Sequence, residues 1–222
     1  MDSEWKFSDD SFMVDDYFDN RPSSRAHKNE DEKPKDRLSQ NNVSMCVTFN
    51  DTYLMKRAFS EKQLNDVFDR IEFQSGVSYH CITTGDCDSL SFLQLVLRRQ
   101  DVRKMLASTW CMASGDILQF GKWIEAGRLN RCDFYVGEIF PNSYRFEWLQ
   151  LNQLVERTQC GRVCCFRNHS KIYAGYGDKF PFVIESSANI NTNPRTEQTC
   201  ITIDKRLAEF YFEFFDKIKP VK

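Results

Sequence analysis

A histidine and a lysine one residue apart, His169 and Lys171, are the side chains in this sequence best suited to chemistry on a phosphate. If residues 167–173 are extended, both side chains leave the same face of the strand and lie side by side. Such a pair is costly in a protein core, because desolvation and a like-charged neighbour both disfavour ionisation. Beside a phosphate the pair is useful, since the ammonium binds the non-bridging oxygens while a neutral imidazole nitrogen attacks phosphorus. These two residues are therefore the centre of a candidate active site.

A turn of small and polar residues at 186–191, Ser-Ser-Ala-Asn-Ile-Asn, follows the next apolar stretch of the chain. Small residues let the backbone and the side chains of Ser187 and Asn189 approach an anion closely. Asn191 lies in the same turn, and we expect it to bind substrate. Arg195 follows shortly after, and the sequence leaves two interpretations of it open, a phosphate contact and a surface salt bridge.

The two motifs together resemble the signature of the phospholipase D superfamily, in which H-x-K is followed by a strand and a G-S-x-N turn. In this chain His169-x-Lys171 is followed by Ser187-x-Asn189. An acidic residue, Glu197, lies a few positions later, as it does in that family.

The likeness extends over the layout of helices and strands from about residue 77 to 218, and it departs from the family at two positions. The glycine that precedes the serine is replaced by Ser186. The aspartate that usually follows the lysine after four residues is replaced by Tyr176, and the nearest acid is Asp178. We therefore keep Asp178 as a further candidate for the site.

The resemblance implies a phosphodiesterase that uses neither metal nor cofactor, in which two H-x-K motifs face each other across a two-fold or pseudo-two-fold axis. One histidine forms a phosphohistidine and the other protonates the leaving group. On this pattern His169 would be the nucleophile or the general acid, and Lys171 and Asn189 would hold phosphate oxygens. Ser187 would line the pocket, and Glu197 would orient an imidazole through its other ring nitrogen.

The chain carries one H-x-K motif, which predicts a homodimer with the active site at its two-fold axis. We expect the substrate to be nucleic acid, either DNA or RNA, because no membrane-seeking amphipathic segment is visible. In addition, the small soluble members of the family with one motif are mostly nucleases. Two alternatives stay open: a catalytically silent adaptor that binds nucleic acid or regulates a partner, and a lipid phosphodiesterase.

The remaining candidate groups have weaker chemical settings. His80 lies in an alternating stretch that suits a core or rim histidine, and His27 lies in a highly charged stretch. The nine cysteines include no Cys-x-x-Cys pair, and no histidine lies at ligand spacing from the acids at predicted strand ends, so we expect no metal site. The segment Ser108-Thr-Trp110 ends a predicted strand, where its residues either contact substrate or serve in a turn.

Composition limits the classes of protein that this chain can represent. Among 222 residues, 30 are basic and 32 acidic, a formal net charge of -2. This balance excludes a strongly basic protein whose whole surface binds nucleic acid, but it is compatible with a local basic cleft. No run of about 18 apolar residues occurs, so we expect no membrane insertion. The N-terminal residues lack the order of a signal peptide and the cysteines fit a reduced state, which predicts a cytoplasmic protein.

Residues 1–42 differ in composition from the rest of the chain. They hold eleven acidic and seven basic side chains, a net charge of -4, whereas residues 43–222 carry a net charge of +2. The middle of this segment has almost no apolar residues and cannot offset its ordering entropy, so we expect a disordered linker. Ahead of it, aromatic residues are interleaved with aspartates, a pattern that suits either docking on a partner or domain, or a solvating tail. We place the folded domain at residues 43–222.

The elements that must position these residues follow from the periodicity of apolar side chains. Alternating or short continuous apolar runs predict strands, and apolar residues spaced three or four apart predict helices. The predicted strands are 77–84, 102–110, 132–140, 161–166, 172–176, 180–185 and 199–203. The predicted helices are 59–73, 88–97, 117–129, 146–155 and 204–218, with Asp88 and Asp204 as N-caps. This alternation predicts an α/β fold with a mixed, mostly parallel sheet and helices on both faces.

Overall fold

The computed structural model describes residues 61–85, 87–191 and 195–220. The segment 1–42, predicted to be a disordered tail and linker, lies outside these ranges, so the division of the chain at residue 42 stays a prediction. None of the helices within these ranges is both long enough and apolar enough to cross a membrane.

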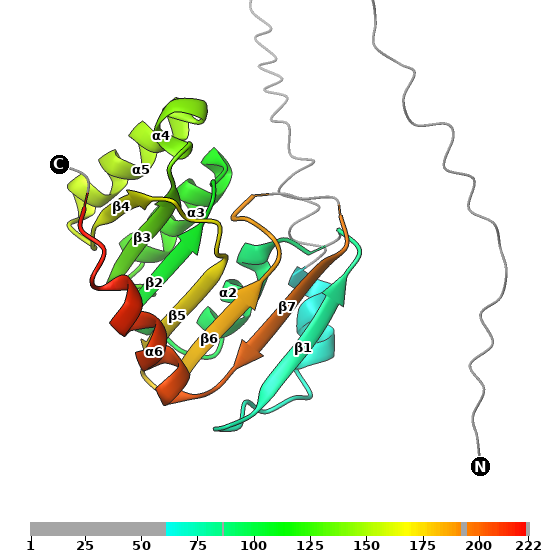
Figure 1. The fold of residues 1–222 in the computed structure, drawn as a ribbon. Helices are drawn as coiled ribbons and strands as arrows, with labels where there is room; N and C mark the ends of the chain where they lie inside the picture. Colours follow the sequence, from blue (N-terminus) through cyan, green and yellow to red (C-terminus); the bar gives the residue numbers. More distant parts are fainter. Residues whose placement is uncertain (1–60, 86, 192–194, 221–222) are drawn as a thin grey trace, which may run out of the picture. The chain divides into compact units, whose positions relative to one another are not determined.

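The strands within these ranges form one seven-stranded sheet in the order β1-β7-β6-β5-β2-β3-β4 (Figure 1). β1 and β4 are therefore its two edges. The strands are β1 (Ser78–Thr83), β2 (Val102–Thr109), β3 (Cys132–Gly137), β4 (Val163–Phe166), β5 (Ile172–Gly177), β6 (Pro181–Ser186) and β7 (Glu197–Thr202).

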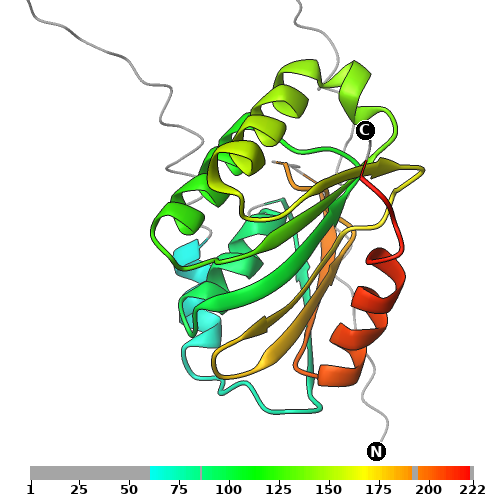
Figure 2. The same cartoon turned by 90° about the vertical axis from the view of Figure 1, so that its left-hand side faces the viewer.

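Helices cover both faces of this sheet (Figure 2). One face packs against residues 61–68, which are helical, and against three of the longer helices through a core that includes Phe68, Leu93, Phe120 and Leu151. The other face packs against the C-terminal helix through Phe212 and its neighbours. The helices are α2 (Ser89–Leu97), α3 (Ser114–Glu125), α4 (Phe140–Ser143), α5 (Arg145–Thr158) and α6 (Lys205–Phe215).

The predicted mixed α/β sheet with helices on both faces is confirmed, whereas the expectation that most of its pairings are parallel is wrong. Of the six pairings in the described sheet, β1–β7, β7–β6, β6–β5 and β5–β2 are antiparallel. β2, β3 and β4 run parallel to one another because α3, α4 and α5 form the crossovers between them. Between β5, β6 and β7 the connections are short and carry no helix in the described residues, so each strand returns antiparallel to the last.

Local sequence signals set several of the element boundaries. Asp88 caps α2 by accepting a hydrogen bond from the Ser91 N–H at 3.0 Å, and Asp204 caps α6 in the same way, as predicted. β3 ends at Gly137, three residues before its predicted end. The reason is that residues 140–143 form the short helix α4, with a proline in its first turn where a missing N–H is tolerated.

Candidate active site

The connection between β4 and β5 carries the H-x-K motif across one end of the sheet. β4 lies beyond β3 at the edge, while β5 pairs with β2 on the other side, so residues 167–171 must pass the carboxyl ends of β3 and β2. Those ends coincide because β2, β3 and β4 are parallel. In α/β proteins this is the edge at which ligands bind.

Asn168 fixes this connection to the two strands beneath it. Its side chain is 5% exposed, and its amide NH₂ group donates to Ser108 Oγ at 3.0 Å, to the Thr109 carbonyl at 3.2 Å and to the Tyr135 carbonyl at 3.0 Å. Its Oδ1 accepts hydrogen bonds from the Ser170 N–H at 3.1 Å and the Ser170 hydroxyl at 2.7 Å. Asn168 therefore holds the backbone on both sides of the histidine that follows it.

His169 and Lys171 are in direct contact. The imidazole is exposed, and Lys171 Nζ lies 2.9 Å from Nδ1 and 2.6 Å from the carbonyl oxygen of His169. Residues 167–171 lie outside the strands, so this contact arises in an irregular segment and not from the extended strand that the spacing suggested. Burial lowers the pKa of Lys171, while Cys111 and Glu197 act in the opposite direction.

Ser187 and Glu197 form a second pair of groups beside the motif. The Ser187 hydroxyl donates a short hydrogen bond to Glu197 Oε2 and accepts one from the Gln198 N–H at 2.9 Å. The hydroxyl predicted to line the pocket thus also positions the carboxylate. Glu197 is 8% exposed, and its charge acts on Lys171, whereas its predicted role in orienting an imidazole stays a prediction.

Asn189 is oriented by the end of β2. Its Oδ1 accepts hydrogen bonds from the Trp110 N–H at 3.3 Å and the Thr109 hydroxyl at 3.4 Å, which leaves the amide NH₂ group as the donor. The Thr109 hydroxyl also accepts a hydrogen bond from the Ile190 N–H at 3.1 Å. The structure therefore ties the 186–191 turn to the same strand end that holds the H-x-K connection.

Three of the remaining candidates differ in their placement. Asn191 lies beside the site, where its NH₂ group is 3.8 Å from Cys111 Sγ. Arg195 is exposed, and its predicted contact with phosphate stays a prediction. Asp178 follows β5, at the opposite end of that strand from the motif, and forms an exposed ion pair with Arg103 at 3.3 Å. The structure thus removes Asp178 from the candidate site.

The structure adds aromatic and thiol neighbours to which the sequence gave no definite role. The centroids of the Trp110 and His169 rings lie 5.5 Å apart, with their planes at 57°. Cys111 is buried, which raises the pKa of its thiol, and it is hydrogen-bonded to Tyr144. Of these residues, only Trp110 had a signal in the sequence, since it ends a predicted strand. Cys111 and Tyr144 had none, because they lie far apart in the chain and their contact leaves no local sequence pattern.

The described residues contain no group of three or more His, Cys, Asp or Glu side chains arranged to hold a metal ion. At this edge the structure brings together the imidazole of His169 and the ammonium of Lys171, and it ties the turn that carries the Asn189 amide to the end of β2. An ammonium and an amide NH₂ group can bind phosphate oxygens, and a neutral imidazole nitrogen can attack phosphorus.

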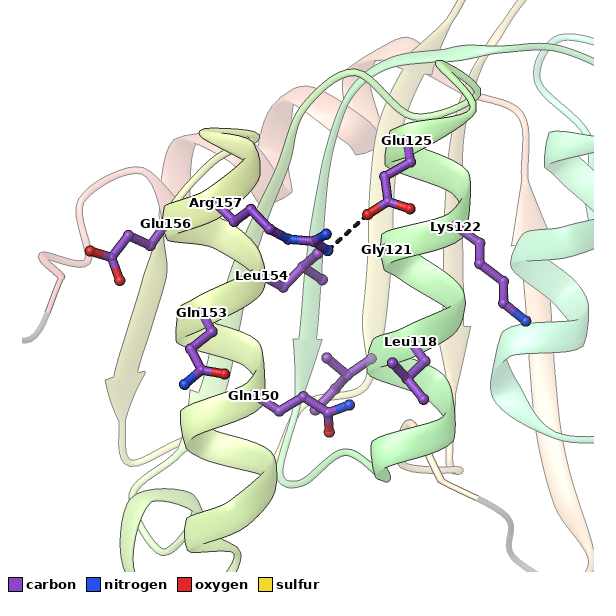
Figure 3. Close-up of a pocket in the computed structure, with 10 residues that line it drawn as sticks. Leu118, Gly121, Lys122, Glu125, Gln150, Gln153, Leu154, Glu156 and Arg157 are labelled. Carbon is purple, nitrogen blue, oxygen red and sulfur yellow. Dashed lines mark ion pairs between the residues drawn. The ribbon is translucent and has the colours of Figure 1, made fainter. Parts of the chain in front are cut away.

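A separate groove of 680 Å³ lies between α3 and α5, and none of the candidate site residues line it (Figure 3). Its apolar residues include Leu118, which is 59% exposed, and Leu154. An ion pair between Arg157 and Glu125 at 2.8 Å joins the two helices across it. The other charged side chains that line it, Lys122 and Glu156, are exposed.

No family model and no curated protein matches this chain. Among solved structures, NucT from Helicobacter pylori is similar with 15% identity and a TM-score of 0.48, over 64% of this chain and 96% of that one. Phosphatidylserine synthase from Haemophilus influenzae Rd KW20 has 12% identity and a TM-score of 0.44, over 63% and 37%. Polyphosphate kinase from Porphyromonas gingivalis has 19% identity and a TM-score of 0.40, over 70% and 25%. These values are too low to transfer a function, so the contacts around His169 alone identify the candidate site.

Proposed function

We propose that this protein cleaves phosphodiester bonds in nucleic acid without a metal ion, through a covalent phosphohistidine at His169. One observation carries the proposal: Asn168 holds an exposed imidazole at the carboxyl edge of the sheet, with the Lys171 ammonium 2.9 Å from it. The oriented NH₂ group of Asn189 lies on a turn tied to the same strand end. The motif likeness to the phospholipase D superfamily points to the same chemistry.

The reaction would proceed in two displacements at phosphorus. Lys171 and the NH₂ group of Asn189 bind the non-bridging oxygens and offset the charge that develops on them. Nε2 of His169 attacks phosphorus, forming a P–N bond as the P–O bond to the leaving group breaks, and the leaving oxygen takes a proton from a general acid. Water then attacks phosphorus, giving its proton to the general acid group that lost one in the first step, and the P–N bond breaks, which releases the second product and restores the imidazole.

The general acid in this scheme is the His169 of a second copy, so the proposal includes a homodimer with its active site at the two-fold axis. Within the chain, His80 lies in β1 at an edge of the sheet, where its Nε2 is 3.8 Å from Cys200 Sγ. His27 lies outside the described residues. Light scattering should therefore give the mass of a dimer for the active protein, and a strictly monomeric active enzyme would contradict this arrangement.

The direct test is replacement of the proposed nucleophile. His169→Asn should lower the cleavage of labelled DNA and RNA oligonucleotides in EDTA by on the order of 10³-fold or more, because the covalent step is lost. His80→Asn removes an imidazole outside the site and should leave the rate within about twofold. Full activity of the His169→Asn variant, or an absolute need for a divalent metal, would overturn the proposed mechanism.

A second candidate function, a catalytically silent adaptor that binds nucleic acid, is favoured by one contact. Because an ammonium only donates, its contact with Nδ1 places the ring proton of a neutral His169 on Nε2, and that nitrogen is then not a nucleophile. A silent adaptor would bind DNA with an affinity that falls with salt concentration, yet it would release no product and form no covalent adduct. Binding and cleavage measured on the same oligonucleotide separate the two functions.

A further inference from the structure

Trp110 lies directly beside the proposed nucleophile but is not used by the phosphodiesterase scheme. It is the first residue after β2, and its ring centroid lies 5.5 Å from that of His169. Its indole stays partly exposed, whereas Trp123 in the core is only 7% exposed. Trp110 packs in part against the hydrophobic core, and its exposed part lies beside the His169 ring, where a ligand can reach it.

Gly137 provides the space in which this indole is fixed. A Cβ atom at position 137 would overlap Cδ1 of Trp110 and would lie 2.8 Å from its carbonyl oxygen, so no side chain fits there without moving the tryptophan. The Gly137 backbone N–H donates to that carbonyl oxygen at 3.2 Å, and the Trp110 backbone N–H donates to Asn189 Oδ1 at 3.3 Å, so both bonds fix the Trp110 backbone. The contacts with Gly137 and with the His169 ring place the indole between the end of β3 and His169.

A flat aromatic side chain next to a bound phosphate favours a phosphodiester that carries a ring close to its phosphate, and this separates nucleic acid from lipid substrates. In nucleic acid, a base lies within one sugar of every scissile phosphate, and every base has a π-face that stacks on an aromatic side chain. In a duplex those faces are already stacked on neighbouring bases, whereas in a single strand they are free. A lipid phosphodiester has no such ring next to its phosphate.

We propose that Trp110 stacks on an unpaired nucleobase adjacent to the phosphate at His169, so that the site selects single-stranded nucleic acid. This inference rests on the proposed function, because it names the substrate that the same site selects. Trp110 thereby acts as a specificity residue, and the cleavage chemistry itself stays with His169, Lys171 and Asn189.

The test compares two single-stranded oligonucleotides with the same sugar-phosphate backbone, one with bases and one abasic. Trp110→Leu should lower kcat/KM on the oligonucleotide with bases by about 5- to 100-fold, the range of one lost stacking contact. Its kcat/KM on the abasic oligonucleotide should change by less than about twofold. On the oligonucleotide with bases, Trp110→Phe should have a kcat/KM between those of the wild type and Trp110→Leu, because its smaller ring still stacks. An equal loss on both substrates would overturn the proposal, since Trp110 would then act only through the His169 ring.

Two further variants serve as a second probe and a matched control. Gly137→Ala should lower the rate on the oligonucleotide with bases, because the added Cβ displaces the indole. The same Cβ would lie 2.8 Å from the Trp110 carbonyl oxygen and 3.0 Å from the Asn168 carbonyl oxygen, so a smaller loss on the abasic strand is expected as well. Phe210→Leu changes an aromatic side chain that is 61% exposed on α6, on the opposite face of the sheet, and should alter neither rate. Thermal unfolding of each variant confirms that the fold is retained. If Gly137→Ala folds and still shows wild-type rates on bases, the indole is not the stacking surface.

Binding measurements separate this inference from the proposed function. If the wild-type protein cleaves neither oligonucleotide, the phosphodiesterase proposal fails, and the dissociation constants of the two oligonucleotides still test stacking. Tighter binding of the base-containing strand, lost in Trp110→Leu, would support the stacking site on a silent adaptor. Equal binding of both strands, or tighter binding of a duplex of the same sequence, would overturn it.

Discussion

Lys171 Nζ lies 2.9 Å from Nδ1 of His169, so the group proposed to hold phosphate touches the group proposed to attack it. Because the ammonium only donates, this contact keeps the proton of a neutral ring on Nε2 for as long as it lasts. Attack by Nε2 requires that proton to move to Nδ1, and hence requires Lys171 to leave. In the proposed mechanism, a phosphate that draws the ammonium to its oxygens would therefore also free the imidazole to react.

Replacement of Lys171 by methionine should lower kcat/KM on oligonucleotides by about 10²- to 10³-fold, because one preorganised charge on the phosphate is lost. Lys171→Arg keeps the charge in a different geometry and should recover part of the rate. Steady-state kinetics gives kcat/KM for both variants and for the wild type. A Lys171→Met enzyme as fast as the wild type would show that the ammonium does not bind the reacting phosphate.

The pH dependence of the reaction should reveal the same lysine. Burial lowers the pKa of Lys171, so as pH rises this ammonium loses its proton earlier than an ordinary lysine, whose pKa is about 10.4. The neutral amine binds phosphate poorly, and kcat/KM should therefore fall on the alkaline side before that pH is reached. In Lys171→Arg, whose guanidinium stays charged, this alkaline fall should disappear. An unchanged alkaline fall in that variant would assign it to another group.

Asn189→Asp separates the structural contact of this side chain from its proposed function. An aspartate keeps the oxygen that accepts from the Trp110 N–H, but it loses the NH₂ donor and places a negative charge beside the phosphate. We expect the melting temperature to change little, while kcat/KM falls by about 10²- to 10³-fold. Equal losses of stability and of activity would indicate a structural role alone.

Asn168→Ala should be one of the more destabilising single substitutions at this edge of the sheet. It removes hydrogen bonds to Ser108, Thr109, Tyr135 and Ser170 and leaves buried groups without partners, at a cost on the order of 3 kcal/mol. Urea denaturation measures this loss. The matched control is Asn152→Ala, which removes one hydrogen bond to the Trp148 carbonyl on the partly exposed α5 and should cost about 1 kcal/mol or less. Similar costs for the two variants would contradict the role given to Asn168.

The sequence predicted the mixed α/β sheet with helices on both faces, which the structure confirms, and it indicated site residues whose roles stay predictions. His169 and Lys171 are close in sequence, and the 186–191 turn follows one strand later, so local spacing was enough to link them. Strand direction depends on contacts between segments far apart in the chain, which is why the antiparallel pairings of β5, β6 and β7 were not anticipated.

Two side chains show why the rest could not be predicted. Asn168 has no distinctive pattern around it, and its role depends on β2 and β3 ending side by side beneath it. For Trp110 the sequence showed only that it ends a strand, and it left a substrate contact and a turn role equally open. Its position against His169 depends on the absence of a side chain at Gly137, which lies more than twenty residues later in the chain.

The measurement that tests the central claim most directly is capture of the covalent intermediate. The protein is mixed with an oligonucleotide in EDTA, quenched with base, which preserves a P–N bond, and analysed by intact-mass and peptide mass spectrometry. We predict an added nucleotide phosphate on the peptide that contains His169, labile to acid and absent in His169→Asn. Rapid turnover with no adduct at any time, or an adduct on another residue, would contradict the proposal that His169 is the nucleophile.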